Sequence, residues 1–443
     1  MRLPEPPPDL ERLFHDEPSQ ARQALAALLE PQRPADDYLH WDDLRRRPPP
    51  EGFDVRGWWA TLKLRRSATQ RTWPLADELG RPFHVNLPDQ ATDLLRRIDG
   101  ALGGQISVSD PALGDDDRRL YLRRSLEEEA LESSLMEGAA TTRAVGRELL
   151  RSGRLPTSVG ERMIRNSLEA LNEVRAWGDA RWTPDRILSL HAVVTEGTLS
   201  DPADAGRLRR HDDVVVRDVD GELLHQPPPA ASLPARLVAM CAFANGDTPG
   251  PYLHPVVRSI LLHFWLAWDH PFVDGNGRTA RALFYASMLR HRYWVVEYLP
   301  ISRKLHQAPA QYARAFLLTE TDGRDATYFL LHQLRVLVAA LDDLDAHVAR
   351  SREKTRDMVR ALHLEGALNP RQLALVEHAR AHPGAAFTVR SHERSAGVSY
   401  PTARSDLLDL EARGVFRAWM RGRERVFVAA TDLDAVLRGL HAR

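Results

Sequence analysis

The sequence is poor in cysteine and in lysine. Its single cysteine, Cys241, has no partner in the chain, which excludes an intrachain disulfide and a cysteine-based metal site. Cys241 stands in LVAMCAFAN, a segment typical of an apolar helix face, so we expect a buried structural thiol and not a nucleophile. Only three of the 60 basic residues are lysines, a bias that indicates GC-rich, bacterial coding.

Long apolar runs and an excess of one charge are missing as well. No apolar stretch reaches the roughly 20 residues that span a bilayer. The first residues, MRLPEPPPDLERLF, lack the cationic and then apolar order of a signal peptide. We therefore expect a cytoplasmic protein that does not enter a membrane. The 60 basic residues face 61 acidic ones, so any contact with nucleic acid must come from a local patch.

The composition that is present, 43% hydrophobic and 27% charged, suits two or three globular domains. The first 50 residues carry ten prolines, which disfavour helix and sheet, and we expect them to be only partly ordered. Apolar content recovers after residue 50. We interpret residues 1–108 as an N-terminal accessory region.

From residue 109 to 345 almost every segment has the apolar spacing of an amphipathic helix, with Ser, Thr, Asp or Pro at its start. The exception is DVVVRDVDGELLHQP, residues 213–227, where β-branched residues flank an Asp-Gly turn and predict a hairpin. Residues 346–367 are expected to be a helical linker. The pattern predicts a mainly α-helical domain with one small hairpin.

The last segment, 368–443, has a different order: a helix, a helix-turn-helix around Gly397, and a hairpin with arginines at its tip. This order resembles a winged helix domain of the α+β type. From residue 366 to 443, 12 arginines oppose 8 acidic residues. Such a domain binds DNA or serves protein contact, and this modest excess does not decide between them. The tip arginines are Arg421, Arg423 and Arg425.

The stretch HPFVDGNGRTAR, residues 270–281, follows the apolar run VVRSILLHFWLAW. Pro271 should end the preceding helix near His270, which places the imidazole at the mouth of a loop. Gly275 and Gly277 allow successive backbone N–H groups to point into one concavity. The helix that follows adds the positive end of its dipole, so the concavity favours phosphate.

The charged residues of this loop agree with bound nucleotide phosphates. Arg278 and Arg281 lie three apart on one helix face and can clamp further phosphate oxygens. Asp274 would repel the phosphates unless a Mg²⁺ ion lay between them. His270 has an ordinary pKa of about 6.5, which suits a general base toward a hydroxyl. The stretch predicts nucleotide phosphate chemistry with an attacking hydroxyl.

The same stretch resembles the signature of the Fic family, HxFx(D/E)GNGRxxR. Eight specified residues at fixed spacing make this match specific, unlike a short glycine motif. The resemblance covers residues 109–345. It includes the 213–227 hairpin, which corresponds to the family's target-docking flap, and AGRLRRHD before it. The matching residues are His270, Phe272, Asp274, Gly275, Asn276, Gly277, Arg278 and Arg281.

The resemblance implies a helical Fic core that transfers AMP from ATP to a Ser, Thr or Tyr hydroxyl of a target protein. His270 would take the hydroxyl proton, Asp274 would hold Mg²⁺, and Phe272 would pack under the loop. Tyr312 matches a position that often borders the nucleobase, whereas Thr319 stands where the family often has asparagine. Gly275, Asn276 and Gly277 would hold the α- and β-phosphates, Arg278 the β-phosphate region and Arg281 the γ-phosphate.

A second motif, SSLMEG, resembles the family's inhibitory signature (S/T)xxxE(G/N). Ser133 and Glu137 are four apart and share one face of a helix expected over about 117–138, and Gly138 can end that helix. The resemblance implies that Glu137 pairs with Arg281 and competes with the γ-phosphate.

Together these features predict a Mg-dependent protein adenylyltransferase restrained by Glu137, with its target docked on the 213–227 hairpin. Two alternatives stay open. Glu137 could position a water that removes AMP from a modified protein, or the chain could be a DNA-binding regulator whose Fic core only senses nucleotide. A pure interaction scaffold is disfavoured by the intact His270 and Asp274. The target, the modified hydroxyl, the nucleobase and a homodimer are left open by the sequence.

Overall fold

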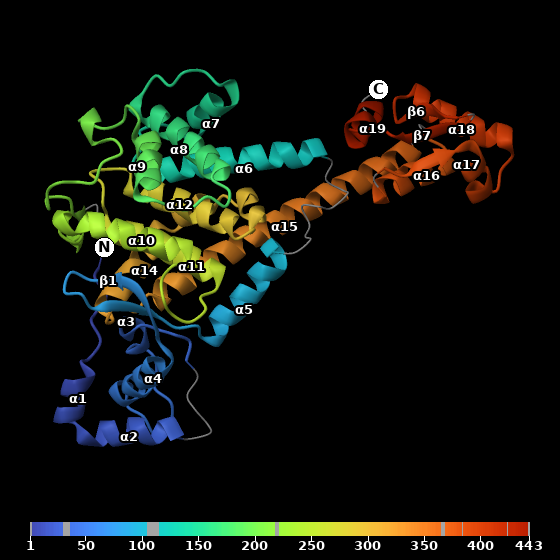
Figure 1. The fold of residues 1–443 in the computed structure, drawn as a ribbon. Coiled ribbons are helices and arrows are strands. Elements are labelled where there is room, and N and C mark those ends of the chain that lie inside the picture. Colours follow the sequence, from blue (N-terminus) through green and yellow to red (C-terminus); the bar gives the residue numbers. More distant parts are fainter. Residues whose placement is uncertain are drawn as a thin grey trace. The chain divides into compact units, whose positions relative to one another are not determined.

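The computed structural model describes residues 2–29, 36–103, 115–217, 221–364, 368–382, 384–422 and 424–441, and it is mainly α-helical (Figure 1). The chain divides into two compact units, which we describe separately. One comprises residues 1–103 and 125–340, and the other residues 104–124 and 341–443. Over the described residues no helix is both long and apolar enough to cross a membrane.

The N-terminal region holds more regular structure than its proline content predicts. Pro18 occupies the first position of a helix, where its missing N–H costs no hydrogen bond. Asp9 caps another helix by accepting from the N–H of Arg12 at 2.8 Å. The elements are α1 Leu10–Asp16, α2 Pro18–Leu29, α3 Trp41–Leu44, α4 Val55–Thr69, the antiparallel pair β1 Arg71–Ala76 and β2 Pro82–Val85, α5 Asp89–Ile98 and a π-helical turn Asp99–Gly103.

The helical core follows in the chain and surrounds a helix that is buried on all sides. This helix, α11, is mostly apolar and buried along most of its length, as expected of a helix packed between others, although it also carries buried Ser259 and His263. Cys241 is buried in α10, as predicted, and burial raises the pKa of its thiol to about 12, which disfavours the reactive thiolate. The helices are α6 Asp115–Met136, α7 Arg143–Ser152, α8 Val159–Ala176, α9 Pro184–Thr195, α10 Leu233–Asn245, α11 Pro255–Asp269, α12 Asn276–Arg290, α13 Ile301–Gln307, α14 Pro309–Thr321 and α15 Thr327–Leu364, with short 3₁₀ turns at Pro202–Asp204, Ala230–Ser232 and Trp294–Tyr298.

The predicted flap hairpin is present. Strands β3, Val216–Arg217, and β4, Leu223–His225, pair antiparallel, with Val216 opposite His225. Gly221 has a φ of 83°, the left-handed conformation that the predicted Asp-Gly turn needs. Asp220 lies outside the described residues.

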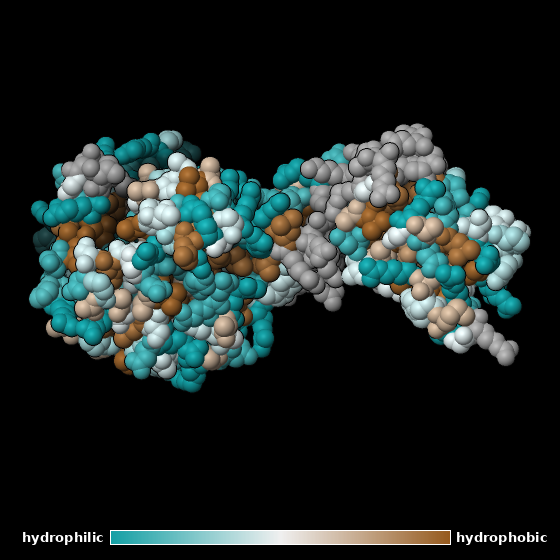
Figure 2. All heavy atoms as spheres, turned by 90° about the horizontal axis from the view of Figure 1, so that it is seen from above, coloured by the Kyte–Doolittle hydropathy of each residue, from teal (hydrophilic) through white to brown (hydrophobic). Residues whose placement is uncertain are grey.

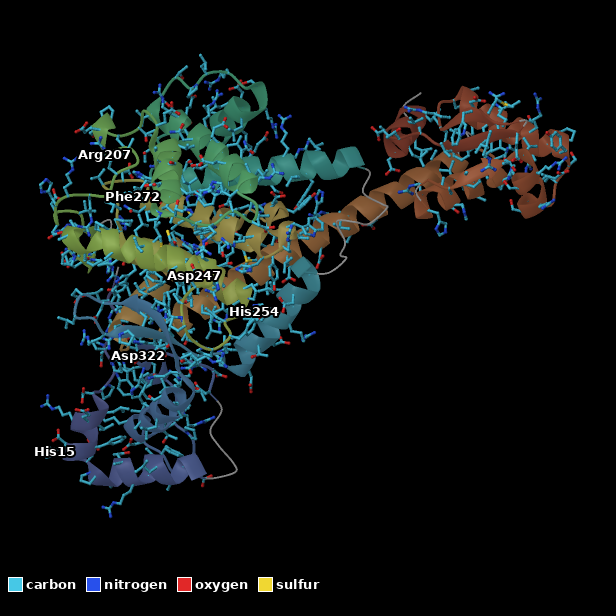
Figure 3. All side chains as sticks on the ribbon, in the orientation of Figure 1. His15, Arg207, Asp247, His254, Phe272 and Asp322 are labelled. Carbon is cyan, nitrogen blue, oxygen red and sulfur yellow. The ribbon has the colours of Figure 1, made fainter. Side chains whose placement is uncertain are left out.

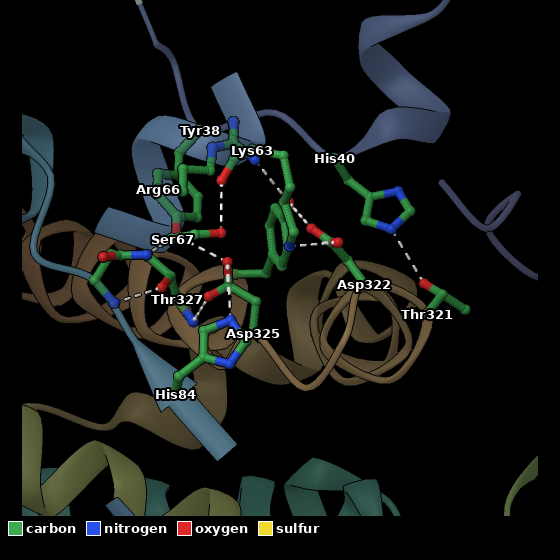
Figure 4. Close-up of polar contacts among 12 residues, drawn as sticks. Tyr38, His40, Lys63, Arg66, Ser67, His84, Thr321, Asp322, Asp325 and Thr327 are labelled. Atoms are coloured by element: carbon green, nitrogen blue, oxygen red, sulfur yellow. Dashed lines mark hydrogen bonds and ion pairs between the residues drawn. The ribbon is translucent and has the colours of Figure 1, made fainter. Parts of the chain in front are cut away.

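A buried polar cluster ties the N-terminal region to the turn between α14 and α15 (Figure 4). Lys63 Nζ lies 2.5 Å from Asp322 Oδ1, and the Tyr328 hydroxyl donates to Asp322 Oδ2 at 2.7 Å. The Tyr38 hydroxyl donates to Asp325 Oδ2 at 2.8 Å. The two carboxylates and the two tyrosines of this cluster are buried and paired, so the turn after α14 is held by contacts to the N-terminal region.

The second unit contains the predicted helix-turn-helix and hairpin. Gly397, with a φ of 63°, forms the turn between α17 and α18. Strand β5 joins the hairpin in a three-stranded sheet of order β5-β7-β6, which the sequence did not suggest. Of the three predicted tip arginines, Arg423 lies outside the described residues. The elements are α16 Pro370–Ala381, β5 Ala386–Thr388, α17 Val389–Ala396, α18 Tyr400–Ala412, β6 Phe416–Arg421, β7 Glu424–Ala429 and α19 Leu433–His441.

The face seen in Figure 2 is mostly hydrophilic, with hydrophobic side chains scattered across it. Exposed large hydrophobic residues in the second unit include Trp419 and Met420 on β6 and Tyr400 at the start of α18. Single apolar side chains of this kind are common on protein surfaces.

Candidate active site

His270 stands where α11 ends and the loop begins. Its backbone is left-handed, with a φ of 42°, and its N–H donates to the carbonyl of Leu266 at 3.0 Å, which ends the helix where Pro271 predicts. Ring atom Nδ1 lies 3.3 Å from the carbonyl oxygen of Ala267. Since a carbonyl only accepts, Nδ1 carries the proton and Nε2 keeps a free lone pair.

The protonation state of His270 suits a general base. Burial is the main cause that lowers the pKa of His270 to about 4, and the positive groups around it act in the same direction. The carboxylate of Glu137 opposes this shift but does not cancel it. The imidazole is therefore neutral at pH 7 and ready to accept a proton.

The loop after His270 is closed by its own asparagine. Asn276 Oδ1 accepts from the N–H of Phe272 at 2.9 Å, and Nδ2 donates to the carbonyl of Phe272 at 2.8 Å. The Asn276 amide is thus engaged within the loop, and what it offers a phosphate is its backbone N–H in the first turn of α12. Phe272, labelled in Figure 3, is fully buried under the loop, as predicted.

His191 on α9 fixes the loop from below, and the sequence analysis did not single it out. Its ring stacks on Phe272, with centroids 3.7 Å apart and planes 4° from parallel. Nδ1 accepts from the N–H of Gly206 at 3.1 Å, so Nε2 donates to the carbonyl of Asp274 at 2.9 Å. Burial lowers the pKa of His191 to about 4, which preserves this neutral tautomer.

Arg209 holds the other side of the loop. Its Nε donates to the carbonyl of His270 at 3.0 Å, and its backbone N–H donates to the carbonyl of Pro271 at 2.9 Å. The same guanidinium donates to the carbonyls of His211 and Pro228, at the two ends of the flap segment. Arg209 lies within AGRLRRHD, which was the one sequence signal that pointed to it.

The loop glycines shape the N-terminus of α12. Gly275 is the N-cap with a φ of 81°, and a Cβ there would approach Thr195 Cγ2 to 2.8 Å, so only glycine fits. A Cβ on Gly277 would lie 2.0 Å from Glu137 Oε1. Gly275 has no side chain to cap this helix end, and its own N–H donates to Asp274 Oδ1 at 2.5 Å, so the following N–H groups and the positive dipole of α12 are what the site offers an anion.

In this structure the anion at that helix end is Glu137. Its Oε1 lies 2.8 Å from Arg281 Nη2, and the side chains are 26% and 5% exposed. Ser133, one turn earlier on α6, accepts from Arg281 Nε at 2.8 Å through its hydroxyl and from Nη2 at 2.9 Å through its carbonyl. Burial acts to raise the pKa of Glu137, but the charges of Arg281 and Arg278 outweigh it and hold that pKa below its ordinary value.

Arg278 and Asp274 share the rim of the site. Arg278 is 2% exposed and donates from Nη1 to the carbonyl of Val194 at 3.1 Å, with Nη2 only 3.5 Å from Asp274 Oδ2. The Asp274 side chain is 52% exposed. Among the described residues no three His, Cys, Asp or Glu side chains form a metal cluster. A single exposed carboxylate beside an anion site still suits Mg²⁺, which usually takes one or two carboxylates and completes its shell with phosphates and water.

Tyr312 and Thr319 on α14 both have engaged hydroxyls. The Tyr312 hydroxyl lies 2.8 Å from His263 Nε2, and burial raises the pKa of Tyr312 to about 12. Burial lowers the pKa of His263 to about 3, so this histidine is neutral. Thr319 is fully buried, and its hydroxyl donates to the carbonyl of Ala315 at 3.2 Å.

Comparison with known proteins shows which proteins this chain resembles. Residues 181–288 match the model of the Fic/DOC family. A protein adenylyltransferase Fic of Nematostella vectensis is 28% identical over 174 residues, which cover 39% of this chain and 38% of that protein. The protein of the same name from Drosophila melanogaster is 35% identical over 107 residues, covering 24% of this chain and 20% of that protein.

Residues 181–288 are therefore a Fic/DOC family domain. The matched stretch spans less than two fifths of the length of these curated relatives. Among solved structures, a Fic family protein from Desulfovibrio desulfuricans aligns over 77% of this chain and 96% of its own, with 19% identity and a TM-score of 0.49.

Proposed function

We propose that this chain is a protein adenylyltransferase that transfers AMP from Mg-ATP to a Ser, Thr or Tyr hydroxyl of a target protein. The observation that carries the proposal is the imidazole of His270, kept neutral by burial, in the loop that leads into the N-terminus of α12, where Glu137 is the anion in this structure. A base and an anion site at one loop are what attack of a hydroxyl on a phosphate requires.

In the proposed reaction the target hydroxyl oxygen bonds to the α-phosphorus of ATP. The bond from that phosphorus to the bridging oxygen of the β-phosphate breaks, and pyrophosphate leaves. His270 Nε2 accepts the hydroxyl proton, and the N–H groups of Gly275, Asn276 and Gly277 neutralise phosphate oxygens. Mg²⁺ held by Asp274 would balance the charge of the phosphates.

Both curated relatives are named protein adenylyltransferase, which supports this reaction class. The hairpin β3–β4 supports a protein as the acceptor. Its strands are short, and a two-stranded hairpin leaves unpaired main-chain groups at its edges. An extended target segment could pair with such an edge and carry its hydroxyl toward His270.

The proposal is tested with ATP labelled either at the α- or at the γ-phosphate. We expect the full chain, incubated with Mg-ATP and a bacterial protein extract, to transfer the α-label to protein and to leave the γ-label in pyrophosphate. Mass spectrometry should find an AMP adduct on a hydroxyl residue. Transfer of the γ-label instead would indicate phosphorylation and would contradict the proposal.

A second candidate function is DNA binding by the second unit, and α18 favours it. Tyr400, Arg404 and Ser405 are exposed in its first two turns, while Asp406 is buried and paired with Arg371 at 2.8 Å. The start of this helix therefore presents polar and basic groups without an exposed acid, as a helix that enters the major groove does.

The hairpin contributes less to this candidate than its arginines suggest. Arg425 pairs with Glu411 at 2.7 Å, and Arg421 lies 3.4 Å from Glu424. These ion pairs neutralise part of the basic charge that would otherwise face phosphates.

If α18 binds DNA, the full chain should bind a fluorescent duplex with an affinity that falls steeply as salt rises. Arg404→Ala should weaken binding and lower the salt slope by about 1 if that arginine contacts a phosphate. Arg413→Ala at the other end of α18, where Arg413 pairs with Asp409, is the matched control and should bind as wild type. Binding that is undetectable at low salt, or insensitive to salt, would leave a protein-contact role.

A further inference from the structure

One face of α6 carries a row of polar residues, each four positions after the one before. Residues with this spacing lie one above another on a helix, so the polar row runs along the helix axis. Its members are Ser125, Glu129, Ser133 and Glu137. The first three are buried, and the row ends at the pair between Glu137 and Arg281.

Glu129 joins the polar row to the start of α13. The N–H of Ser302 donates to Glu129 Oε2 at 2.7 Å, and the Ser302 hydroxyl donates to the other carboxyl oxygen. Ser302 is the second residue of α13, so its N–H has no acceptor within that helix. Pro300, the N-cap residue, has no side-chain acceptor for it either. Glu129 therefore caps α13 from a neighbouring helix.

Helix α12 binds the same end of α13. The Tyr285 hydroxyl accepts from the N–H of Ile301 at 3.2 Å and donates to the carbonyl of Leu299 at 2.6 Å. Tyr285 lies one turn after Arg281 on α12. The start of α13 is thus bound at adjacent residues by α6, through Glu129, and by α12, through Tyr285.

The two helices that carry Glu137 and Arg281 are therefore linked twice. The direct link is the pair itself, together with the contacts of Ser133 to the same guanidinium. The indirect link starts at Glu129, about two turns earlier on α6, and passes through the start of α13. A helix held at two points of one face cannot turn about its axis or slide along it without breaking buried hydrogen bonds.

The contacts of Glu129 do not depend on its charge. Burial raises the pKa of Glu129, while the hydrogen bonds from Ser302 and the charge of Arg281 oppose that shift. A carboxyl group accepts hydrogen bonds when it is ionised, and it keeps acceptor capacity when it is protonated. The geometry of the buried hydrogen bonds, and not an ion pair, is what ties α6 to α13.

We propose that Glu129 is a positioning residue that fixes the register of α6 against α13 and thereby holds Glu137 on Arg281. It lies outside the predicted inhibitory motif, whose first residue is Ser133. Without this anchor α6 would still be helical, but Glu137 would leave Arg281 more often. The effect on nucleotide binding rests on the proposed function. The anchoring of α6 does not, and it is measurable without nucleotide.

Hydrogen–deuterium exchange of the full chain tests the anchor. We expect Glu129→Ala to speed exchange of the amides of residues 133–137 by about 10-fold, because this turn loses the buried contacts beside it. Glu129→Gln should exchange as wild type, since its amide can accept from the Ser302 N–H and donate to the Ser302 hydroxyl. Glu128→Ala removes a pair with Arg147 at 2.9 Å and is the matched control, which should also exchange as wild type in this turn. Amides of α11 should be unaffected in all variants, which verifies the fold.

The exchange rates can contradict the proposal in several ways. Rates of residues 133–137 in Glu129→Ala within about twofold of wild type would mean that Glu129 does not hold this turn. Equal acceleration in Glu129→Gln would mean that its charge acts instead of its hydrogen bonds, and equal acceleration in Glu128→Ala that loss of any contact loosens α6. If Glu129→Ala does not fold, Ser302→Ala removes one of the two contacts from the other partner and should speed the same amides by about 3-fold. Unchanged exchange in Ser302→Ala would then overturn the proposal.

Calorimetric affinities for Mg-ATP and Mg-ADP test the consequence for Glu137. While Glu137 occupies Arg281, a γ-phosphate gains little, so wild type should bind the two nucleotides about equally. Glu129→Ala should favour ATP over ADP by about 3-fold, and Glu137→Gly should favour it by about 10-fold. The double variant should match Glu137→Gly, because Glu129 acts through Glu137. A general loss of structure would instead weaken the binding of both nucleotides alike.

The same affinities separate a failure of this proposal from a failure of the proposed function. An unchanged ratio in Glu129→Ala beside a raised ratio in Glu137→Gly would overturn the proposal, and so would additive effects in the double variant. If Glu137→Gly neither changes the ratio nor labels any protein, the proposed function fails. Exchange at residues 133–137 then decides the anchor on its own.

Discussion

Replacing Glu137 with glycine should increase ATP-dependent protein labelling by about 10-fold or more. The carboxylate occupies the helix end above Gly277 and pairs with Arg281, the groups on which a bound nucleotide's phosphates would depend. One guanidinium cannot serve the carboxylate and a γ-phosphate at once. A tenfold gain follows if the pair supplies about 1.4 kcal/mol of the block, within the range of charge-assisted hydrogen bonds.

The Glu137→Gly variant should remain folded, because Ser133 still accepts from Arg281 through both its hydroxyl and its carbonyl. Two neighbouring substitutions sharpen the test. Glu137→Gln keeps the shape but loses the charge and should give intermediate labelling. Ser133→Ala removes one neutral contact and leaves the carboxylate in place, so it should label close to wild type.

The measurement is labelling with α-labelled ATP at matched protein and Mg-ATP concentrations, with thermal melting as the control for folding. If Glu137→Gly melts normally but labels no better than wild type, the inhibitory role of Glu137 fails. Removal of AMP would then become the better hypothesis, with Glu137 positioning water. An AMP-modified protein incubated with wild type and with Glu137→Gly would test that alternative directly.

The sequence predicted those parts of the site that lie close together in the chain. The end of α11 at His270 follows from Pro271, and the burial of Phe272 was implied by the family resemblance of residues 270–281. Pairing of Glu137 with Arg281 was reached only through the family resemblance, because the two residues are 144 positions apart. Nothing in the local pattern of either helix places them in contact.

Contacts made by single residues from distant elements were not predictable. His191 is one polar residue in an amphipathic helix, and such a residue gives no sign that it will stack under a loop 80 residues later. Asn276 shows a different limit of the sequence analysis. The motif identified the residue, but it did not predict that the side-chain amide of Asn276 bonds to the backbone of Phe272 within the loop.

Replacing His270 should abolish transfer and leave ATP binding largely intact. Loss of a general base typically costs about 10²- to 10⁴-fold in rate, and the phosphate contacts come from α12 and not from the imidazole. His270→Asn is the preferred variant, because asparagine tolerates the left-handed backbone that His270 adopts better than alanine does. When combined with Glu137→Gly, replacement of His270 by asparagine or by alanine should reduce labelling to the level of a control without enzyme, since removal of a block cannot supply a base. Robust labelling by His270→Asn would remove the proposed role.

The pH dependence of labelling gives a second, independent check on His270. Its neutral form is the active one, and burial places its pKa at about 4, so activity should persist as the pH falls below 6.5 and decline only as it approaches 4. A solvent-exposed histidine, with a pKa of about 6.5, would already have lost half of its base form at that pH. Removal of Glu137 takes away a charge that raises the pKa of His270, so the decline in activity of Glu137→Gly should begin at a pH no higher than in wild type.

Rates should be measured in single-turnover labelling with circular dichroism at each pH, because unfolding of the protein in acid would otherwise resemble protonation of the base. A midpoint near 6.5 in folded protein would mean that the buried, neutral imidazole is not the base of the reaction.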